Sequence, residues 1–211
     1  MRHSALVRVT HWITVVSFIA LLWSGVAILL AHPRLYWGET GALGTPSLID
    51  LPLPFVLTGQ SGWGRYLHFL SAWVLVLSGA AYLLGGMRAC HFRNDLFPVT
   101  PKRRSREGGR PAEPAKYTVV QRVMYTAVVF VLVPVMIWTG FAMSPAITSV
   151  FPGLVTALGG QQSARTIHFV VASLLVLFLV GHVVMVSLAG FTRYVGAMIL
   201  GGEHLVRESR T

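Results

Sequence analysis

The segment RTIHFVVASLLVLFLVGHVVMVSLA, residues 165–189, decides the class of this protein. From Thr166 to Ala189 it carries no acidic or basic side chain other than two histidines. A helix needs about 20 mostly apolar residues to cross roughly 30 Å of hydrocarbon. The segment therefore predicts a transmembrane helix over about 166–189.

Three further segments have the same length and character, at about 8–31, 66–87 and 119–143, the last with Pro134 inside it. After the fourth span, residues 191–206 have the composition of a short amphipathic helix that lies along a membrane surface. We predict an all-α integral membrane protein: one domain over residues 1–211, built as a four-transmembrane-helix bundle with a short C-terminal amphipathic helix.

Composition supports a membrane protein over a soluble one. Of the 211 residues, 54% are hydrophobic and 11% are charged, whereas a soluble domain has about 25% charged residues. The net charge of +10 is spread over loops between apolar runs, so we expect membrane lipid and no nucleic acid as a partner. The single cysteine excludes an internal disulfide framework, and no C-x-x-C-H motif is present for covalent haem.

The distribution of basic residues predicts the orientation. All but three of the 17 Lys and Arg lie before residue 11, in 88–122 or after residue 190; the exceptions are Arg34, Arg65 and Arg165. Because cytoplasmic loops carry the excess of Lys and Arg, we expect both termini to be cytoplasmic, in a bacterial inner membrane. The connections 32–65 and 144–163 then face outward.

Four histidines fall inside the predicted spans, where ionisable residues are costly and usually functional. His168 and His182 are fourteen residues apart on one helix, which is about four turns, so they share a face at levels roughly 21 Å apart. His68 matches the outer level and His11 the inner one. The pattern predicts two haem b groups, an inner one held by His11 and His182 and an outer one held by His68 and His168.

Ligation by two histidines leaves iron no open position, which favours electron transfer over oxygen chemistry. Two other interpretations stay open. The histidines could be buried residues that form hydrogen bonds between helices, or they could carry protons in a haem-free transporter or scaffold.

Three arginines each precede one of these histidines by three residues: Arg8, Arg65 and Arg165. Residues three apart share a helix face, so these guanidinium groups could pair with haem propionates; ordinary interfacial arginines would follow the same pattern. Gly181 directly precedes His182 and could border a haem, although glycine also serves helix packing.

The pattern resembles the bacterial cytochrome b561 and nickel-hydrogenase cytochrome b superfamily, whose members include formate dehydrogenase gamma subunits and thiosulfate reductase cytochrome b subunits. The resemblance rests on RVTHW (8–12), RYLH (65–68) and the paired histidines of the fourth span. The segments 116–122, 139–145 and 162–169 look most like members that accompany periplasmic molybdenum-dependent oxidoreductases. The resemblance implies the same haem pairing.

By this resemblance, the chain would be an electron-transfer subunit that connects membrane quinone with a periplasmic oxidoreductase partner, and Tyr36, Trp37 and Glu39 are candidate docking residues. A cluster at the start of the third span could bind the quinone: Tyr117, Gln121, Arg122 and Tyr125. Interfacial anchoring explains those residues equally well. The alternative function is a stand-alone b561-type quinone reductase that takes electrons from a small donor such as superoxide.

Overall fold

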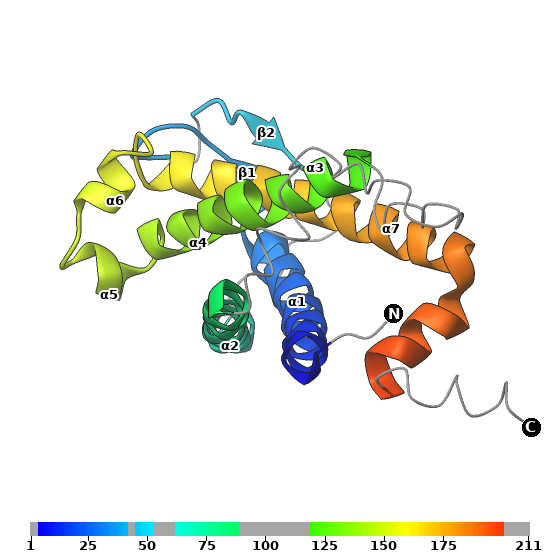
Figure 1. Ribbon diagram of the computed structural model, residues 1–211. Helices are drawn as coiled ribbons and strands as arrows, with labels where there is room; N and C mark the ends of the chain where they lie inside the picture. The colour runs from blue at the N-terminus through cyan, green and yellow to red at the C-terminus, as the bar shows by residue number, and fades with distance from the viewer. Residues whose placement is uncertain (1–3, 42–44, 53–61, 89–118, 201–211) are drawn as a thin grey trace, which may run out of the picture.

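The computed structural model describes residues 4–41, 45–52, 62–88 and 119–200. Within these ranges four long, apolar helical segments could cross a membrane, which confirms the predicted bundle (Figure 1). They are α1 (Ala5–Ala31), α2 (Gly62–Arg88), a composite of α3 (Val119–Ala127), the π-helical turn η2 (Val128–Leu132) and α4 (Val133–Ala142), and α7 (Gln161–Leu200). The connections hold β1 (Arg34–Leu35), β2 (Ile49–Asp50), α5 (Pro145–Thr148) and α6 (Gly153–Thr156).

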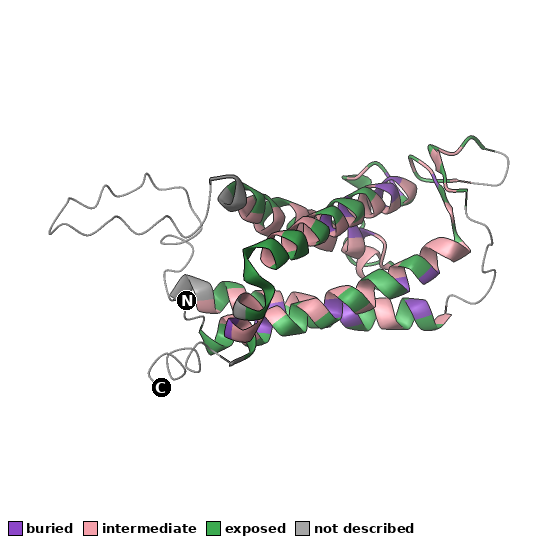
Figure 2. Ribbon diagram, turned by 90° about the vertical axis from the view of Figure 1, so that its right-hand side faces the viewer, coloured by how far each residue is buried: buried purple, intermediate pink, exposed green. Residues whose placement is uncertain are grey.

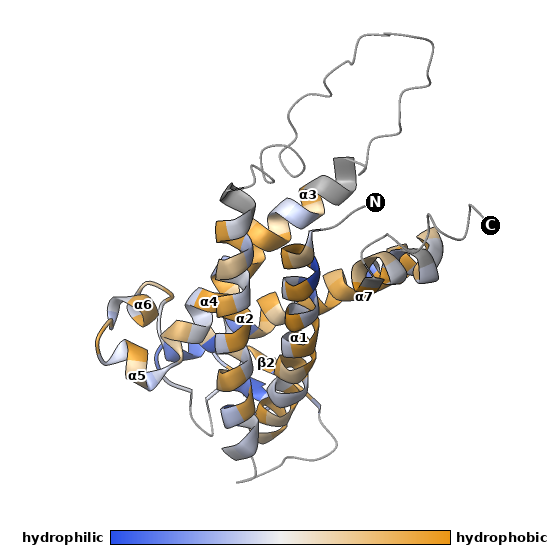
Figure 3. Ribbon diagram, turned by 60° about the horizontal axis from the view of Figure 1, so that its bottom comes forward, coloured by the Kyte–Doolittle hydropathy of each residue, from blue (hydrophilic) through white to orange (hydrophobic). Residues whose placement is uncertain are grey.

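The outer surface of the helices is the apolar one. Large side chains such as Trp23, Leu70 and Leu188 are 70%, 65% and 85% exposed. Figure 2 shows exposed residues along all the long helices, and Figure 3 shows that much of their length is hydrophobic. In water such a surface would be unfavourable, whereas hydrocarbon solvates it. The exposure therefore fits a helix bundle surrounded by lipid.

Small residues allow α1 and α2 to lie close together. Every seventh residue along each helix of this pair is small and buried: Thr10, Ser17 and Ser24 on α1, and Gly64, Ser71 and Ser78 on α2. A seven-residue period keeps one stripe facing the partner helix, and small side chains let two backbones approach in a membrane. The Ser78 hydroxyl donates across this contact to the carbonyl of Thr10, at 3.4 Å.

The third span contains an irregular turn where the sequence places Pro134. In η2 the amide of Val133 bonds the carbonyl of Val128, five residues back, and Pro134 follows in the first turn of α4. Proline has no N–H to donate and its ring disturbs the preceding turn. A π-helical turn absorbs this disturbance by adding one residue to the helix.

The two helix pairs repeat one another in sequence. Arg8 and His11 of α1 correspond to Arg122 and Tyr125 of α3, and Trp-Ser-Gly at 23–25 corresponds to Trp-Thr-Gly at 138–140. The correspondence shifts by one residue between these two matches, and the extra residue lies where η2 widens the helix. The repeat thus extends through the π-helical turn.

The second helices of the two pairs match as well, at a constant separation of 100 residues. Arg65, His68 and Phe69 of α2 stand against Arg165, His168 and Phe169 of α7, and buried Gly64 stands against buried Ala164. One half is therefore α1 with α2, and the other is α3 to α4 with α7.

A sharp bend at Gly190 turns the last part of α7 toward the start of α1. Gly190 has φ 112°, a value that favours glycine. Beyond the bend, Ile199 accepts a hydrogen bond from Arg8 Nη1 at 3.1 Å, and Met198 accepts one from Trp12 Nε1 at 3.3 Å. The C-terminal helix predicted at 191–206 is present as far as Leu200; residues 201–206 lie outside the described residues.

At the other end of the bundle, called here the ribbon end, β1 and β2 form a short antiparallel ribbon. Arg34 pairs with Asp50 in this ribbon, also through a 3.2 Å ion pair on the surface, and Leu35 pairs with Ile49. Leu35 is only 1% exposed, so it anchors the ribbon on the bundle.

The ribbon and the segment after β1 cover the start of α7; residues 34–41 and 45–52 are called here the cap. The carbonyl of Gly38 accepts from the backbone amides of Gln162 and Ser163 at 3.0 and 3.3 Å, and the Gly38 amide donates to Ser163 Oγ at 2.8 Å. One turn later, Thr166 Oγ1 donates to the carbonyl of Tyr36 at 2.6 Å. These bonds satisfy amides that a helix start leaves without intrahelical partners, and they fix α7 just before His168.

Gly160 permits this close approach, which leads to a first prediction. Its φ is +116°, and a Cβ at this position would lie 2.5 Å from the carbonyl of Gly38. Gly160→Ala should cost at least about 1–3 kcal/mol from backbone strain, with the clash added. We expect a lower unfolding temperature in detergent and faster proteolysis within 34–52.

The matched control is Gly153→Ala in α6, where an added Cβ meets no atom within 4 Å. Its unfolding temperature should equal that of the unchanged protein. Equal stability of the two variants would show that the cap does not depend on this contact.

Candidate functional site

Two of the predicted histidines come together at the ribbon end of the bundle. His68 lies in the second turn of α2 and His168 in the second turn of α7, so each helix pair contributes one imidazole. The centres of the two rings are 6.2 Å apart and their planes are inclined by 58°. The structure therefore brings His68 and His168 together, and their binding of a haem stays a prediction.

A serine hydroxyl holds the ring of His68. Ser24 Oγ lies 2.7 Å from the carbonyl oxygen of Ala20 and 3.0 Å from Nδ1 of His68. A hydroxyl has one hydrogen, and the carbonyl, which can only accept, takes it. Ser24 Oγ therefore accepts the N–H of Nδ1, and Nε2 of His68 keeps its lone pair.

The second half of the chain repeats this arrangement. Thr139 Oγ1 donates to the carbonyl of Val135 at 2.9 Å and lies 2.9 Å from Nδ1 of His168. Because the single hydroxyl hydrogen of Thr139 goes to that carbonyl, Oγ1 accepts the N–H of Nδ1, and Nε2 of His168 keeps its lone pair. Both Ser24 and Thr139 are fully buried, so water does not compete for these bonds.

Glycines leave space beside both rings. A Cβ on Gly25 would lie 3.7 Å from Cε1 of His68, and one on Gly140 would lie 3.8 Å from Cε1 of His168. Each glycine directly follows the hydroxyl residue that holds the same ring. Trp-Ser-Gly and Trp-Thr-Gly are thus two copies of one motif, in which the hydroxyl orients an imidazole and the glycine leaves space beside the ring.

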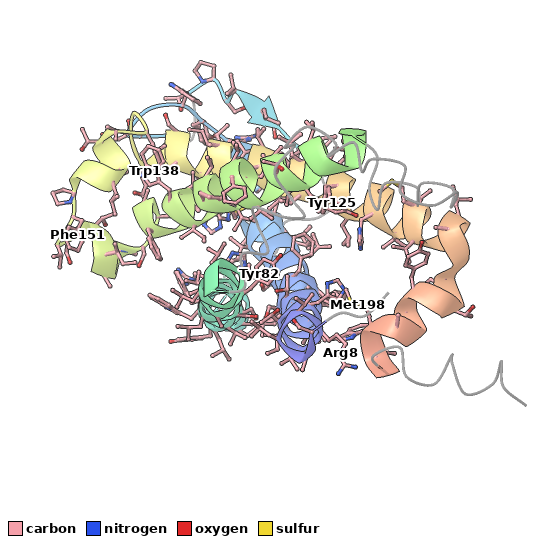
Figure 4. The ribbon with its side chains drawn as sticks, in the orientation of Figure 1. Arg8, Tyr82, Tyr125, Trp138, Phe151 and Met198 are labelled. Carbon is pink, nitrogen blue, oxygen red and sulfur yellow. The ribbon has the colours of Figure 1, made fainter. Side chains whose placement is uncertain are left out.

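The other two histidines lie toward the opposite end of the bundle. His182 of α7 is half-buried: the hydroxyl of Tyr125 is 3.4 Å from its Nδ1, and Phe178 stacks on it with ring centres 6.0 Å apart. His11 of α1 packs edge-on against Trp12, with ring centres 5.7 Å apart. Figure 4 labels Tyr125, which comes from the start of the third span.

Comparison with known proteins identifies the family. The family model for prokaryotic cytochrome b561 matches residues 2–201. The chain belongs to the prokaryotic cytochrome b561 family. It is also 30% identical over 206 residues to YedZ1 of Azospira oryzae, provisionally named a protein-methionine-sulfoxide reductase subunit, covering 94% of this chain and 96% of the relative. No solved structure matches.

Membership of this family confirms the resemblance seen in the sequence. It makes the chain a haem b-binding electron-transfer protein of the membrane. With four apolar spans, the protein is a multi-pass protein of the inner membrane.

The predicted arginines have different surroundings. Arg165, just before His168, donates to the carbonyl of His32, and thus helps to hold the cap. Arg65 is exposed at the start of α2. Arg8 uses Nη1 for the carbonyl of Ile199, while its Nε is buried without a hydrogen-bond partner among the described residues.

The remaining predicted residues are Gly181 and the cluster at the start of the third span. Gly181 has open space beside it, since an added Cβ would meet no atom within 4 Å. Gln121 and Arg122 lie in the first turn of α3, one turn before Tyr125. Tyr117 lies outside the described residues.

Sequence reasoning missed Ser24 and Thr139, and it also missed a groove between the start of α1 and the end of α7. The groove has a volume of about 360 Å³. Its lining is apolar apart from the arginine: Arg8, Val9, Trp12, Ile13, Met198 and Ile199. Arg8 and Met198 are labelled in Figure 4. The repeated W-[ST]-G motif was the signal that could have revealed the two hydroxyl residues.

Proposed function

We propose that this chain is a di-haem cytochrome b that passes electrons between membrane quinone and an oxidoreductase partner outside the membrane. One observation carries the proposal. Two imidazoles, one from each half, lie 6.2 Å apart, and each has its Nδ1 bound to a hydroxyl.

The residues at the ribbon end suit a haem iron. Metal–nitrogen bonds to histidine are about 2 Å long, so two imidazoles whose ring centres are 6.2 Å apart are close enough to hold one metal ion between them. A ligating histidine usually donates its other ring N–H to a neighbouring acceptor, as His68 and His168 do here. We therefore propose that these two histidines hold the outer haem, with Gly25 and Gly140 leaving room for its ring.

His11 and His182 are proposed as the ligands of the inner haem. His182 lies fourteen residues beyond His168 on α7, about four turns and roughly 21 Å, a separation that supports two haems at different depths of the bilayer. Each haem supplies a centre that accepts and releases one electron. The chain orients the imidazoles, and two histidines at each haem would leave its iron no open position, which favours electron transfer over oxygen chemistry.

The ribbon end is proposed as the outer face and the docking site for the partner. In the sequence, 14 of the 17 Lys and Arg lie before residue 11, in 88–122 or after residue 190, so we propose that these segments and both termini are cytoplasmic. Trp37 and Leu48 are 60% and 61% exposed on the cap, and Glu39 is exposed beside them. The name of YedZ1, a reductase subunit, supports an oxidoreductase as partner. The resemblance to subunits of molybdenum-dependent enzymes favours a periplasmic one.

Quinone is proposed to react at the inner end. The groove beside Arg8 has an apolar lining and lies one helical turn from His11. The buried Nε of Arg8 has no hydrogen-bond partner among the described residues and could donate to a quinone carbonyl. The cluster of Gln121 and Arg122 at the start of α3 is the other candidate for the same role, because both side-chain types can donate to a carbonyl.

Ligand variants test the haem assignment. His68→Ala and His168→Ala should each remove the same haem, and His11→Ala and His182→Ala the other, lowering the content from about two haems per chain to about one. Redox-titrated absorption spectra of the purified protein would identify which component is lost. His32→Ala, an exposed residue outside the spans, is the control and should keep both. Loss of the same component from His68→Ala and His182→Ala would refute the pairing.

Arginine variants locate the quinone site. If the groove binds quinone, Arg8→Gln should slow reduction of the haems by a soluble quinol about 10-fold, as expected for loss of a buried hydrogen bond worth about 1–2 kcal/mol, while haem content is unchanged. Arg122→Gln should then react at the normal rate. The reverse result would place the quinone at the start of α3.

A mild-detergent purification separates an electron-transfer subunit from a stand-alone quinone reductase. If the chain is an electron-transfer subunit, an oxidoreductase should co-purify with the tagged protein expressed in its native host. Leu35→Asp, which disrupts the cap, should abolish this co-purification. Full reduction of the haems by superoxide without any partner would favour the stand-alone enzyme.

A further inference from the structure

The sequence repeat fails at the inner level, and the residues that break it are tyrosines. The position of His11 in the first half is held by Tyr125 in the second half, and the position of His182 is held by Tyr82. The outer level has no such exchange, since His68 corresponds to His168. The inner level therefore contains two histidines and two tyrosines at positions that the repeat relates.

Tyr125 contacts His182 in the way that Thr139 contacts His168. Both hydroxyl residues belong to the third span, both reach Nδ1 of a histidine on α7, and the distances are 3.4 and 2.9 Å. The Tyr125 ring also packs edge-on against His182, with an interplanar angle of 76°, and against Phe178 at 82°. These two ring contacts fix the direction from which the phenol approaches the imidazole.

Tyr82 has the corresponding place in the first half. It lies on α2, which packs on α1, and the repeat relates the pair Tyr82 and His11 to the pair His182 and Tyr125. Tyr82 and Tyr125 are both labelled in Figure 4. Each half thus carries one histidine and one tyrosine at the inner level, on opposite members of its helix pair.

We propose that Tyr125 and Tyr82 are positioning residues for the inner haem. Each phenol oxygen accepts the Nδ1–H of the histidine in its own half, Tyr125 from His182 and Tyr82 from His11. The inference rests on the proposed function, because it takes these two histidines as iron ligands.

The chemical consequence concerns the reduction of iron. A hydrogen bond from Nδ1–H makes the imidazole a more basic ligand, and a more basic ligand stabilises the oxidised iron relative to the reduced iron. Removing the phenol oxygen should therefore shift the inner haem toward the reduced form. The outer haem should not respond, because its proposed ligands, His68 and His168, bind Ser24 and Thr139 instead.

The experiment compares Tyr125→Phe, Tyr82→Phe and the unchanged di-haem protein by equilibrium redox titration of the haem absorption band. Each variant should shift one and the same component toward reduction by about 10-fold, which for a one-electron couple equals about 59 mV. Thr139→Val should shift the other component. Tyr194→Phe, in α7 beyond Gly190, is the matched control and should shift neither.

Electron paramagnetic resonance of the oxidised protein gives a second readout. The low-spin signal of the inner haem should change in Tyr125→Phe and stay unchanged in Thr139→Val. This comparison holds even if either variant binds less haem. Two unchanged components in both tyrosine variants would overturn the inference, as would a response of the component that Thr139→Val moves. A native protein without two haem components would instead refute the proposed function itself.

Discussion

The arrangement depends on a hydrogen bond between a buried hydroxyl and an imidazole nitrogen. In hydrocarbon no water can satisfy a histidine ring, so the chain must supply partners for its polar atoms. Ser24 and Thr139 do so at Nδ1 while passing their own hydrogen to the carbonyls of Ala20 and Val135. Each ring is thereby held in one orientation and one tautomer, and the second nitrogen of each imidazole stays available.

Packing of the bundle serves this bond. The seam of small residues brings α1 against α2 closely enough for Ser24 to reach His68. The cap fixes the start of α7 through Gly38 and Thr166 within one turn of His168. The site is therefore positioned from two directions, by helix packing inside the spans and by backbone bonds at their end.

Much of this could be predicted from the sequence. The length of each apolar segment predicts the spans. The depth of a histidine along its own helix predicts that His68 and His168 lie at the same level, and neither quantity depends on how the helices pack. Haem binding by either histidine pair stays a prediction, as do the orientation and the quinone site.

Other features depend on which helices pack together. A serine inside an apolar helix usually bonds its own backbone. The sequence of α1 alone therefore does not indicate that Ser24 also binds His68 of α2. The contacts of Gly38 with the start of α7 join residues about 125 positions apart. Such long-range contacts leave no periodic signal, and Arg165 likewise gave no sign that its guanidinium would bond the loop.

The π-helical turn has a consequence for how the two halves could diverge. One residue more or less rotates the following part of a helix by about 100°. The wide turn at Val128–Leu132 therefore sets the angle between Tyr125 below it and Thr139 above it. The third span is two short helices in series, and a single insertion at their joint can change the direction of Tyr125 without moving Thr139.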